Sequence, residues 1–305
     1  MLKNEEKKTS KLKKIGEWLQ FTLFFIVLKL LSLLPYRTRV STFGWLTEHL
    51  IGPIVGWRRR IKENFAYIFP SLPQTTVQLN SRKTENNIGR FLIEIFSPTD
   101  LRRQATLAVF KGPGLEHLRE AQNRGKPVII VSGHFGNYDM LRAGLIVRGF
   151  DTGALYRPMN NKKFNDIYER AIKKIGTPLF RRGRKGMTAM IKHLRSGKVL
   201  AVLIDQHMDH GIPLEFFDKP ALTSTSSAEM ALKYNSLLIP AYAIRQKNGI
   251  DFHVIFENPI VPSTPEAMTQ QLNDSLEKRV REHMDQWLWT HRRWKMKQRI
   301  GSVND

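Results

Sequence analysis

The chain of 305 residues contains no cysteine. Disulfide bridges, thiolate nucleophiles and metal sites with cysteine ligands are therefore excluded. Acidic side chains are also scarce, because 27 Asp and Glu stand against 49 Lys and Arg, which leaves a formal net charge of +22. A positive field of this size attracts polyanions, namely nucleic acid, an anionic membrane surface, a phosphorylated lipid or an acidic protein.

A clean apolar run of transmembrane length is missing as well. A spanning helix needs about 20 apolar residues, whereas the longest apolar stretch, from Trp18 to Leu34, is interrupted by polar side chains and closed by Pro35. Six lysines lie in the 14 residues at the start of the chain. We therefore predict that residues 1–35 form a basic tail and a membrane-anchor helix, which either spans the bilayer or lies in its interface, with a cytoplasmic N-terminus. The alternative is a buried amphipathic helix of a soluble protein.

No linker rich in glycine, serine or proline divides the rest of the chain, so we predict a single domain over residues 36–305. Long helical patterns cover residues 37–69, 74–96 and 265–299. Between them, short β-rich runs alternate with amphipathic helical segments. The strand candidates are VFKGPG, PVIIVSGH, DTGALYR, KVLAVLID, LLIPAYAIR and DFHVIFEN. This alternation predicts an α/β fold, with a mainly parallel central sheet flanked by helices.

The strongest chemical signal is the segment PVIIVSGHFGNYD, residues 127–139. It predicts a buried strand followed by a turn that carries His134, at the sheet edge where α/β proteins bind their ligands. Asp139 falls in the first turn of the next helix, and we expect its carboxylate to reach the imidazole. Asp139 would then fix the tautomer of His134, which would act as a general base on a hydroxyl. The backbone N–H groups of Phe135 and Gly136 are candidates for stabilising an oxyanion. Alternatively, His134 merely caps the helix.

Several ordered blocks extend this signal over nearly the whole chain. They are RRIKENFAYIFP, HFGNYD, YRPMNN, LFRRG, LIDQ, EFFDKPALTS and WLWTHRRWK. Together with the His-x4-Asp spacing, they resemble the late acyltransferases of lipid A biosynthesis, the bacterial lauroyl and myristoyl transferase family. The resemblance implies a glycerolipid acyltransferase-like fold and the transfer of a fatty acyl chain from an acyl carrier protein to a hydroxyl of a phosphorylated glucosamine disaccharide lipid.

The resemblance also implies where the reaction occurs and what takes part in it. We expect an enzyme of the bacterial inner membrane whose catalytic domain faces the cytoplasm. Its partners would be an acidic acyl carrier protein, a phosphorylated glycolipid acceptor and anionic inner-membrane lipids, and not nucleic acid. Neither a cofactor nor a metal is expected in this reaction. Many relatives carry Glu at the position of Asp139, which leaves its proposed role unchanged.

Within this hypothesis, further residues are candidates for substrate contacts. Arg157 and Arg182, together with Arg181, suit phosphate, because a guanidinium grips phosphate bidentately. Asp205 and Gln206 end the strand of LIDQ, and we expect them to contact the acceptor sugars.

Aromatic residues near the C-terminus form a second pattern. Trp287, His291 and Trp294 have helical spacing, which predicts an aromatic helix face at the lipid headgroup boundary. Phe216 and Phe217 either line an acyl tunnel or pack in the core.

Two other functional classes stay open at the level of the sequence. The segment DQHMDH places Asp205, His207, Asp209 and His210 close together, a donor set that suits the metal of a hydrolase. The net charge and six tryptophans fit a nucleic-acid-binding protein. Against the second class, the chain contains no recognisable nucleic-acid-binding motif.

Overall fold

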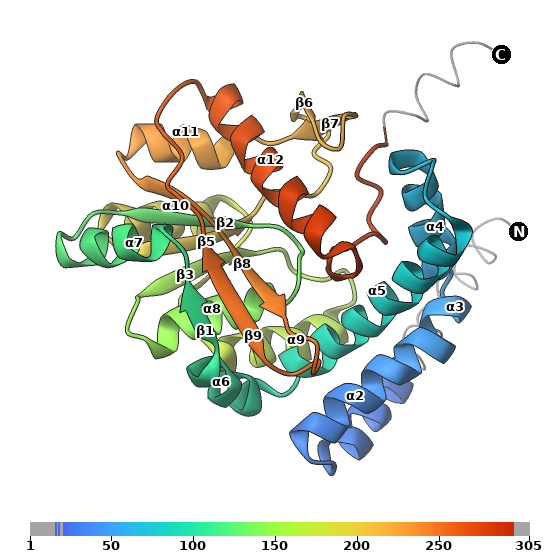
Figure 1. Ribbon diagram of the computed structural model, residues 1–305. Coiled ribbons are helices and arrows are strands. Elements are labelled where there is room, and N and C mark those ends of the chain that lie inside the picture. Colours follow the sequence, from blue (N-terminus) through green and yellow to red (C-terminus); the bar gives the residue numbers. More distant parts are fainter. Residues whose placement is uncertain (1–15, 17, 19–20, 296–305) are drawn as a thin grey trace, which may run out of the picture.

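The computed structural model describes residues 16, 18 and 21–295, and a seven-stranded sheet forms its centre (Figure 1). The strand order is β1-β9-β8-β2-β5-β3-β4, and β6 and β7 form a separate hairpin. The strands are β1 (Val109–Lys111), β2 (Val128–Ser132), β3 (Thr152–Tyr156), β4 (Leu179–Arg181), β5 (Val199–Leu203), β6 (Ile212–Glu215), β7 (Pro220–Thr223), β8 (Leu237–Arg245) and β9 (Phe252–Phe256). All six strands expected from the sequence are present, and the sequence patterns missed β4 and the hairpin.

The sheet is mainly parallel, as predicted. Strands β8, β2, β5, β3 and β4 run in one direction, whereas β9 pairs antiparallel with β8 and parallel with β1. The carboxyl ends of five strands therefore meet at one edge. Because β2 lies in the middle of the sheet and is buried along its whole length, whatever follows Ser132 is held at the centre of that edge.

Helices cover both faces of the sheet. They are α2 (Tyr36–Leu46), η1 (Thr47–Ile51), α3 (Gly52–Ile54), α4 (Trp57–Ile68), α5 (Gln74–Ile95), α6 (Pro98–Leu107), α7 (Gly114–Asn123), α8 (Tyr138–Val147), α9 (Lys162–Ile175), α10 (Arg184–Arg195), α11 (Ser226–Lys233), α12 (Pro265–Glu282) and η2 (Met284–Gln286). Alternate residues of β2 belong to two different cores. Val128 and Ile130 pack with α6 to α9, whereas Ile129 and Val131 pack with α10 to α12.

The single helix predicted over residues 37–69 is divided in the structure. A π-helical turn, η1, separates α2 from α3, and Gly56 adopts a positive φ of 74° before α4 begins. Glycine takes this left-handed conformation without the steric cost of a Cβ atom. The break lets α2 and α4 both pack on the long helix α5, on the side of the molecule away from α7 and α11 (Figure 1).

The described part of the predicted anchor is a helix over residues 21–32, and the tail before residue 16 lies outside the described residues. One side of this helix packs on the protein, where Phe24 contacts Phe96 and Phe164. The opposite side exposes an apolar stripe of Leu23, Ile26, Leu30 and Leu33. Among residues 16, 18 and 21–295, no helix combines the length and apolar character needed to cross a membrane. A spanning anchor is therefore unsupported in the described chain.

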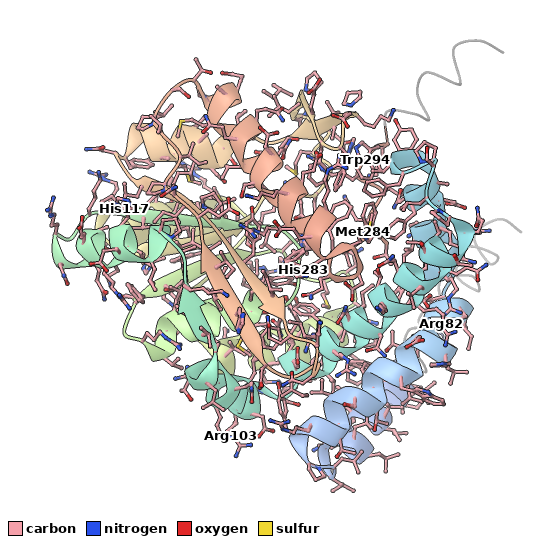
Figure 2. All side chains as sticks on the ribbon, viewed as in Figure 1. Arg82, Arg103, His117, His283, Met284 and Trp294 are labelled. Carbon is pink, nitrogen blue, oxygen red and sulfur yellow. The ribbon has the colours of Figure 1, made fainter. Side chains whose placement is uncertain are left out.

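The predicted helix over residues 265–299 was too long. α12 ends at Glu282, η2 follows, and Trp287 is extended. His283 and Met284 lie at the end of α12, and Trp294 lies beside α4 (Figure 2). The tryptophans after α12 join Phe65 of α4 in one buried cluster. The predicted aromatic face toward lipid headgroups is thus wrong, because Trp287 and Trp294 fill the core.

Candidate active site

His134 lies in the turn that joins β2 to α8. Asn137 caps α8, since its Oδ1 accepts a hydrogen bond of 2.9 Å from the backbone N–H of Met140. Gly136 has a positive φ of 56°, and a Cβ atom there would come within 1.9 Å of the carbonyl oxygen of Ala243. The turn therefore requires glycine at this position, and its tight geometry holds the half-buried ring of His134 at the sheet edge.

The carboxylate that reaches His134 comes from Asp205, two residues after the end of β5. Ser132 pairs with Leu203 in the parallel register, so His134 and Asp205 each lie two residues beyond that pair. Asp205 Oδ1 is 2.7 Å from His134 Nδ1, and Asp205 Oδ2 accepts the backbone N–H of His134 at 2.7 Å. Burial raises the pKa of the Asp205 carboxyl, but the charge and hydrogen bonds of His134, with the indole of Trp287, lower it to about 2. Asp205 is therefore an ionised carboxylate facing the imidazole.

This contact defines the protonation of the imidazole. An ionised carboxylate only accepts hydrogen bonds, so Nδ1 carries the proton and donates a hydrogen bond to Asp205. Nε2 then holds the lone pair, and the side-chain amide of Gln206 lies 3.3 Å from it. Gln206 is exposed, whereas Asp205 is buried. The basic nitrogen of His134 accordingly faces the accessible side of the site.

The contact expected between Asp139 and His134 is absent. Asp139 Oδ1 instead accepts hydrogen bonds of 3.0 and 2.7 Å from the guanidinium of Arg142. The reason is helical geometry, because residues three apart on α8 are neighbours whereas His134 precedes the helix. Arg142 also donates to the carbonyl groups of Ile172 and Gly176, so this buried pair ties α8 to α9.

The backbone amides of the turn are largely occupied. The N–H of Gly136 donates to the carbonyl of Gln286 at 2.8 Å, which excludes the predicted oxyanion role for this group in the observed conformation. The N–H of His134 is used by Asp205. The backbone N–H of Phe135 has no hydrogen-bond partner among the described residues, but Phe135 is fully buried, so this amide is not accessible to substrate in the observed conformation.

The segment after α12 completes the site, which the sequence did not predict. Leu288 donates its backbone N–H to the carbonyl of His134 at 3.0 Å, and the indole N–H of Trp287 donates to Asp205 Oδ2 at 2.8 Å. His291 Nε2 accepts the backbone N–H of His207 at 2.9 Å. Burial lowers the pKa of His291 to about 4, so this ring is a neutral acceptor at neutral pH.

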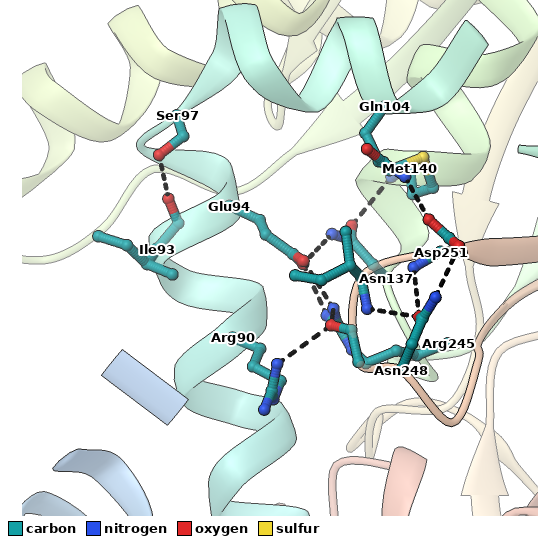
Figure 3. A network of polar contacts seen from close by, with 12 residues as sticks. Arg90, Ile93, Glu94, Ser97, Gln104, Asn137, Met140, Arg245, Asn248 and Asp251 are labelled. Carbon is teal, nitrogen blue, oxygen red and sulfur yellow. Dashed lines mark hydrogen bonds and ion pairs between the residues drawn. The ribbon is translucent and has the colours of Figure 1, made fainter. Parts of the chain in front are cut away.

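A buried polar network holds Asn137, the residue that caps α8 just after the turn of His134 (Figure 3). The carboxylate of Glu94 on α5 forms two 2.6 Å contacts with the guanidinium of Arg245 on β8. Glu94 also accepts a 2.7 Å hydrogen bond from the side-chain amide of Asn137, the cap of α8. The turn of His134 is thereby linked to α5 and to the end of β8. No sequence motif marks this network, because its members lie far apart in the chain.

The predicted substrate contacts have different outcomes. Arg157 follows β3 and Arg182 follows β4, in adjacent strands, and both side chains are exposed. Neither makes an ion pair within the described part of the chain. Asp205, in contrast, is unavailable for acceptor sugars because its carboxylate is buried against His134 and Trp287. Phe216 and Phe217 pack in the tryptophan cluster, which favours the core alternative.

The donor set considered for a metal does not assemble. Asp205 faces His134, whereas His207 Nε2 lies 3.1 Å from the exposed Asp209. His210 is exposed. Among the residues with a described placement, no group of three or more potential ligands is positioned to hold a metal ion.

The fold and this site together define an α/β enzyme with a histidine and a carboxylate at the carboxyl edge of a parallel sheet. Residues 5–296 match the family described as bacterial lipid A biosynthesis acyltransferase, and the chain belongs to this family. The resemblance inferred from the sequence motifs is thus confirmed, and the protein is an acyltransferase of the lipid A biosynthesis type.

Curated relatives agree with this assignment. A lipid A biosynthesis acyltransferase of Haemophilus influenzae is 26% identical over 297 residues, which cover 91% of this chain and 90% of the relative. The lipid A biosynthesis lauroyltransferase of Escherichia coli is 26% identical over 193 residues, 60% of each chain. A phosphatidylinositol mannoside acyltransferase of Mycobacterium tuberculosis is 23% identical over 251 residues, 78% of each chain.

Proposed function

We propose that this protein transfers a fatty acyl chain from the thioester of an acyl carrier protein to a hydroxyl of a lipid A precursor, with His134 as general base and Asp205 as its partner. The observation that carries the proposal is the 2.7 Å contact between His134 Nδ1 and Asp205 Oδ1 at the carboxyl edge of the sheet. It leaves Nε2 as a basic nitrogen on the accessible side.

In the proposed reaction, Nε2 of His134 takes the proton of the acceptor hydroxyl while that oxygen attacks the thioester carbonyl. The new C–O bond forms a tetrahedral intermediate, the C–S bond then breaks, and the imidazolium returns its proton to the leaving sulfur. Asp205 stabilises the imidazolium through the Nδ1 hydrogen bond. Transfer is direct, since the chain has no cysteine and Ser132 is buried.

Asp139 has a supporting role in this proposal. Its buried pair with Arg142 fixes the first turn of α8, and the cap residue Asn137 and the catalytic turn precede that turn directly. A carboxylate at this place stabilises the site by holding the helix and not by contacting the imidazole.

Arg157 and Arg182 are the proposed phosphate ligands. β3 is two strand positions and β4 is three strand positions from β2 in the sheet. With neighbouring strands about 4.8 Å apart, these arginines lie roughly 10 and 14 Å along the edge from the strand of His134. That separation suits a disaccharide that presents a hydroxyl at one end and a phosphate at the other. Guanidinium groups that have no partner among residues 16, 18 and 21–295 suit pairing with this phosphate.

The net charge of the protein and its exposed apolar stripe support the proposed acyl donor and the proposed contact with the membrane. A net charge of +22 favours encounter with an acidic carrier protein by electrostatic steering. The exposed stripe of Leu23, Ile26, Leu30 and Leu33 suits an interfacial helix on the cytoplasmic side of the inner membrane. In this proposal the enzyme lies on anionic lipid and takes its acceptor from the bilayer.

The test measures acyl transfer in mixed micelles. Lauroyl and palmitoleoyl thioesters of acyl carrier protein serve as donors, and a phosphorylated glucosamine disaccharide lipid or phosphatidylinositol mannoside serves as acceptor. We expect transfer to the disaccharide, and His134→Ala should lower kcat by about 10² to 10⁴. The control is His210→Ala, an exposed histidine outside the site, which should retain wild-type rates. Near-wild-type turnover in His134→Ala would overturn the mechanism, and transfer to the mannoside alone would overturn the acceptor.

A further inference from the structure

The two oxygens of the Asp205 carboxylate have different partners. Oδ1 faces the imidazole Nδ1 at 2.7 Å. Oδ2 accepts the backbone N–H of His134 at 2.7 Å and the indole N–H of Trp287 at 2.8 Å. The plane of the carboxylate is therefore set by two donors on the oxygen that does not contact the imidazole.

Trp287 is itself held firmly. Its side chain is 1% exposed, and its ring contacts Phe216 and Trp289 at centroid distances of 5.4 and 4.7 Å. Its backbone forms an antiparallel bridge with Phe135, the residue after His134. The same residue thus contacts the catalytic turn through its main chain and the carboxylate of Asp205 through its side chain.

We infer that Trp287 is a positioning residue for acyl transfer, and that its indole N–H holds the Asp205 carboxylate so that Oδ1 points at His134 Nδ1. This inference rests on the proposed function, because it assigns Trp287 a role only through the pair of His134 and Asp205. Trp287 contacts neither substrate in the proposed reaction, so its removal changes the orientation of the base and not the binding of donor or acceptor.

The physical reason lies in the burial of Oδ2. Without the indole N–H, Oδ2 keeps only the backbone N–H of His134. The carboxylate is then held less firmly, and its Oδ1 contact with the imidazole weakens. A hydrogen bond to a charged group contributes more than one between neutral groups. We expect about a tenfold loss of kcat when the N–H is removed and the ring is kept.

The neighbouring tryptophan provides a matched control. Trp289 is also fully buried in the same cluster, and its indole N–H donates to the carbonyl of Met284 at 2.6 Å. Its removal therefore costs a buried indole hydrogen bond and cluster packing without touching the carboxylate. A purely structural role for the tryptophans predicts the same result at both positions.

The experiment uses the full-length protein in mixed micelles with the lauroyl donor and the disaccharide acceptor. Trp287→Phe and Trp289→Phe are compared, and each position is also replaced by β-(3-benzothienyl)alanine, which keeps the ring size and has sulfur in place of the N–H. For Trp287 we expect kcat to fall about tenfold, with KM for both substrates within about twofold of wild type. For Trp289 we expect kcat and KM close to wild type at a similar loss of Tm.

A spectroscopic readout separates positioning from general damage. In proton NMR spectra, the resonance of the hydrogen-bonded Nδ1 proton of His134 is assigned by its loss in His134→Ala. Its chemical shift should change in the variant with benzothienylalanine at position 287 and stay the same in the variant with benzothienylalanine at position 289. Equal kcat at the two positions, or an unchanged Nδ1 proton resonance in the variant with benzothienylalanine at position 287, overturns the inference. Near-wild-type kcat in His134→Ala and Asp205→Asn overturns the proposed function instead, so the two failures are distinct.

Discussion

Removal of Arg245 should be among the most destabilising single changes in this protein. Arg245 and Glu94 are 4% and 0% exposed at their side chains, and both carboxylate oxygens of Glu94 face the guanidinium at 2.6 Å. Arg245→Met keeps an unbranched side chain but removes the guanidinium, which leaves a buried carboxylate without its cation. Breaking a buried pair in this way costs about 3–5 kcal/mol of unfolding free energy.

The network adds a smaller consequence at the active site. Glu94 also holds the side chain of Asn137, whose cap on α8 contributes about 1 kcal/mol. A Glu94 that turns away from its lost partner withdraws this support, so kcat of the folded fraction should fall in Arg245→Met as well.

The assay is urea unfolding in mixed micelles, followed by tryptophan fluorescence. The matched control is Arg281→Met, which breaks an ion pair with Glu277 that is 46% exposed on the arginine side and should cost less than about 1 kcal/mol. The double replacement Glu94→Leu with Arg245→Met should regain part of the loss, because a buried pair exchanged for apolar side chains is often neutral, whereas the amide of Asn137 loses its buried acceptor. Equal losses in Arg245→Met and Arg281→Met would refute the reasoning.

Four further predictions concern the site and its surroundings. Arg157→Lys keeps the charge and loses the bidentate fork, so KM for the acceptor should rise in steady-state assays while Tm is unchanged; an unchanged KM would contradict phosphate binding. Asp139→Asn should lower stability in urea by about 3–5 kcal/mol, because Arg142 loses its buried partner; loss of kcat at wild-type stability would instead favour a direct catalytic role. The pKa of His291 is lower in the folded protein than in the unfolded chain, so its contribution to stability is present above about pH 6.5 and is lost as the pH falls toward about 4. His291→Gln should therefore flatten the dependence of Tm on pH in this window. An unchanged slope would exclude His291 as the group that titrates there. Rising salt should lower the rate at sub-saturating carrier-protein donor, and a salt-independent rate would contradict electrostatic steering.

The sequence predicted the sheet well because its buried strands are continuous apolar runs. Val128 to Val131 is too short for a helix and too apolar for a loop, and it is the central strand of the structure. β4 escaped the prediction because three residues between two helices carry too little pattern.

The choice of the acid illustrates a limit of sequence reasoning. Asp139 is five residues from His134, whereas Asp205 is 71 residues away and reaches it only through the register of β2 and β5. A motif spacing describes neighbours along the chain, and pairing of strands is decided by the whole sheet. The expectation that LIDQ ends a strand was correct, and the structure places its aspartate against His134 instead of the acceptor sugars.

The tryptophans after α12 illustrate a second limit. Helical spacing of Trp287, His291 and Trp294 predicts a face only if the helix continues, and α12 stops at Glu282. Nothing local in the sequence forces that stop, since no glycine or proline follows until after residue 295. The aromatic side chains find a larger buried surface against α4 and the β6–β7 hairpin, and this tertiary packing overrides the local pattern.

The pairing of Trp287 with Phe135 means that the catalytic site is completed by a segment far along the chain from His134. β2, β5, His134 and Asp205 all precede α12 in the chain, whereas the indole that donates to Asp205 follows it. A fragment cut after α12 lacks both the indole N–H that Asp205 accepts and the backbone pairing with the turn of His134. In the proposed reaction, full turnover therefore requires the segment after α12 as well as the sheet that carries His134 and Asp205.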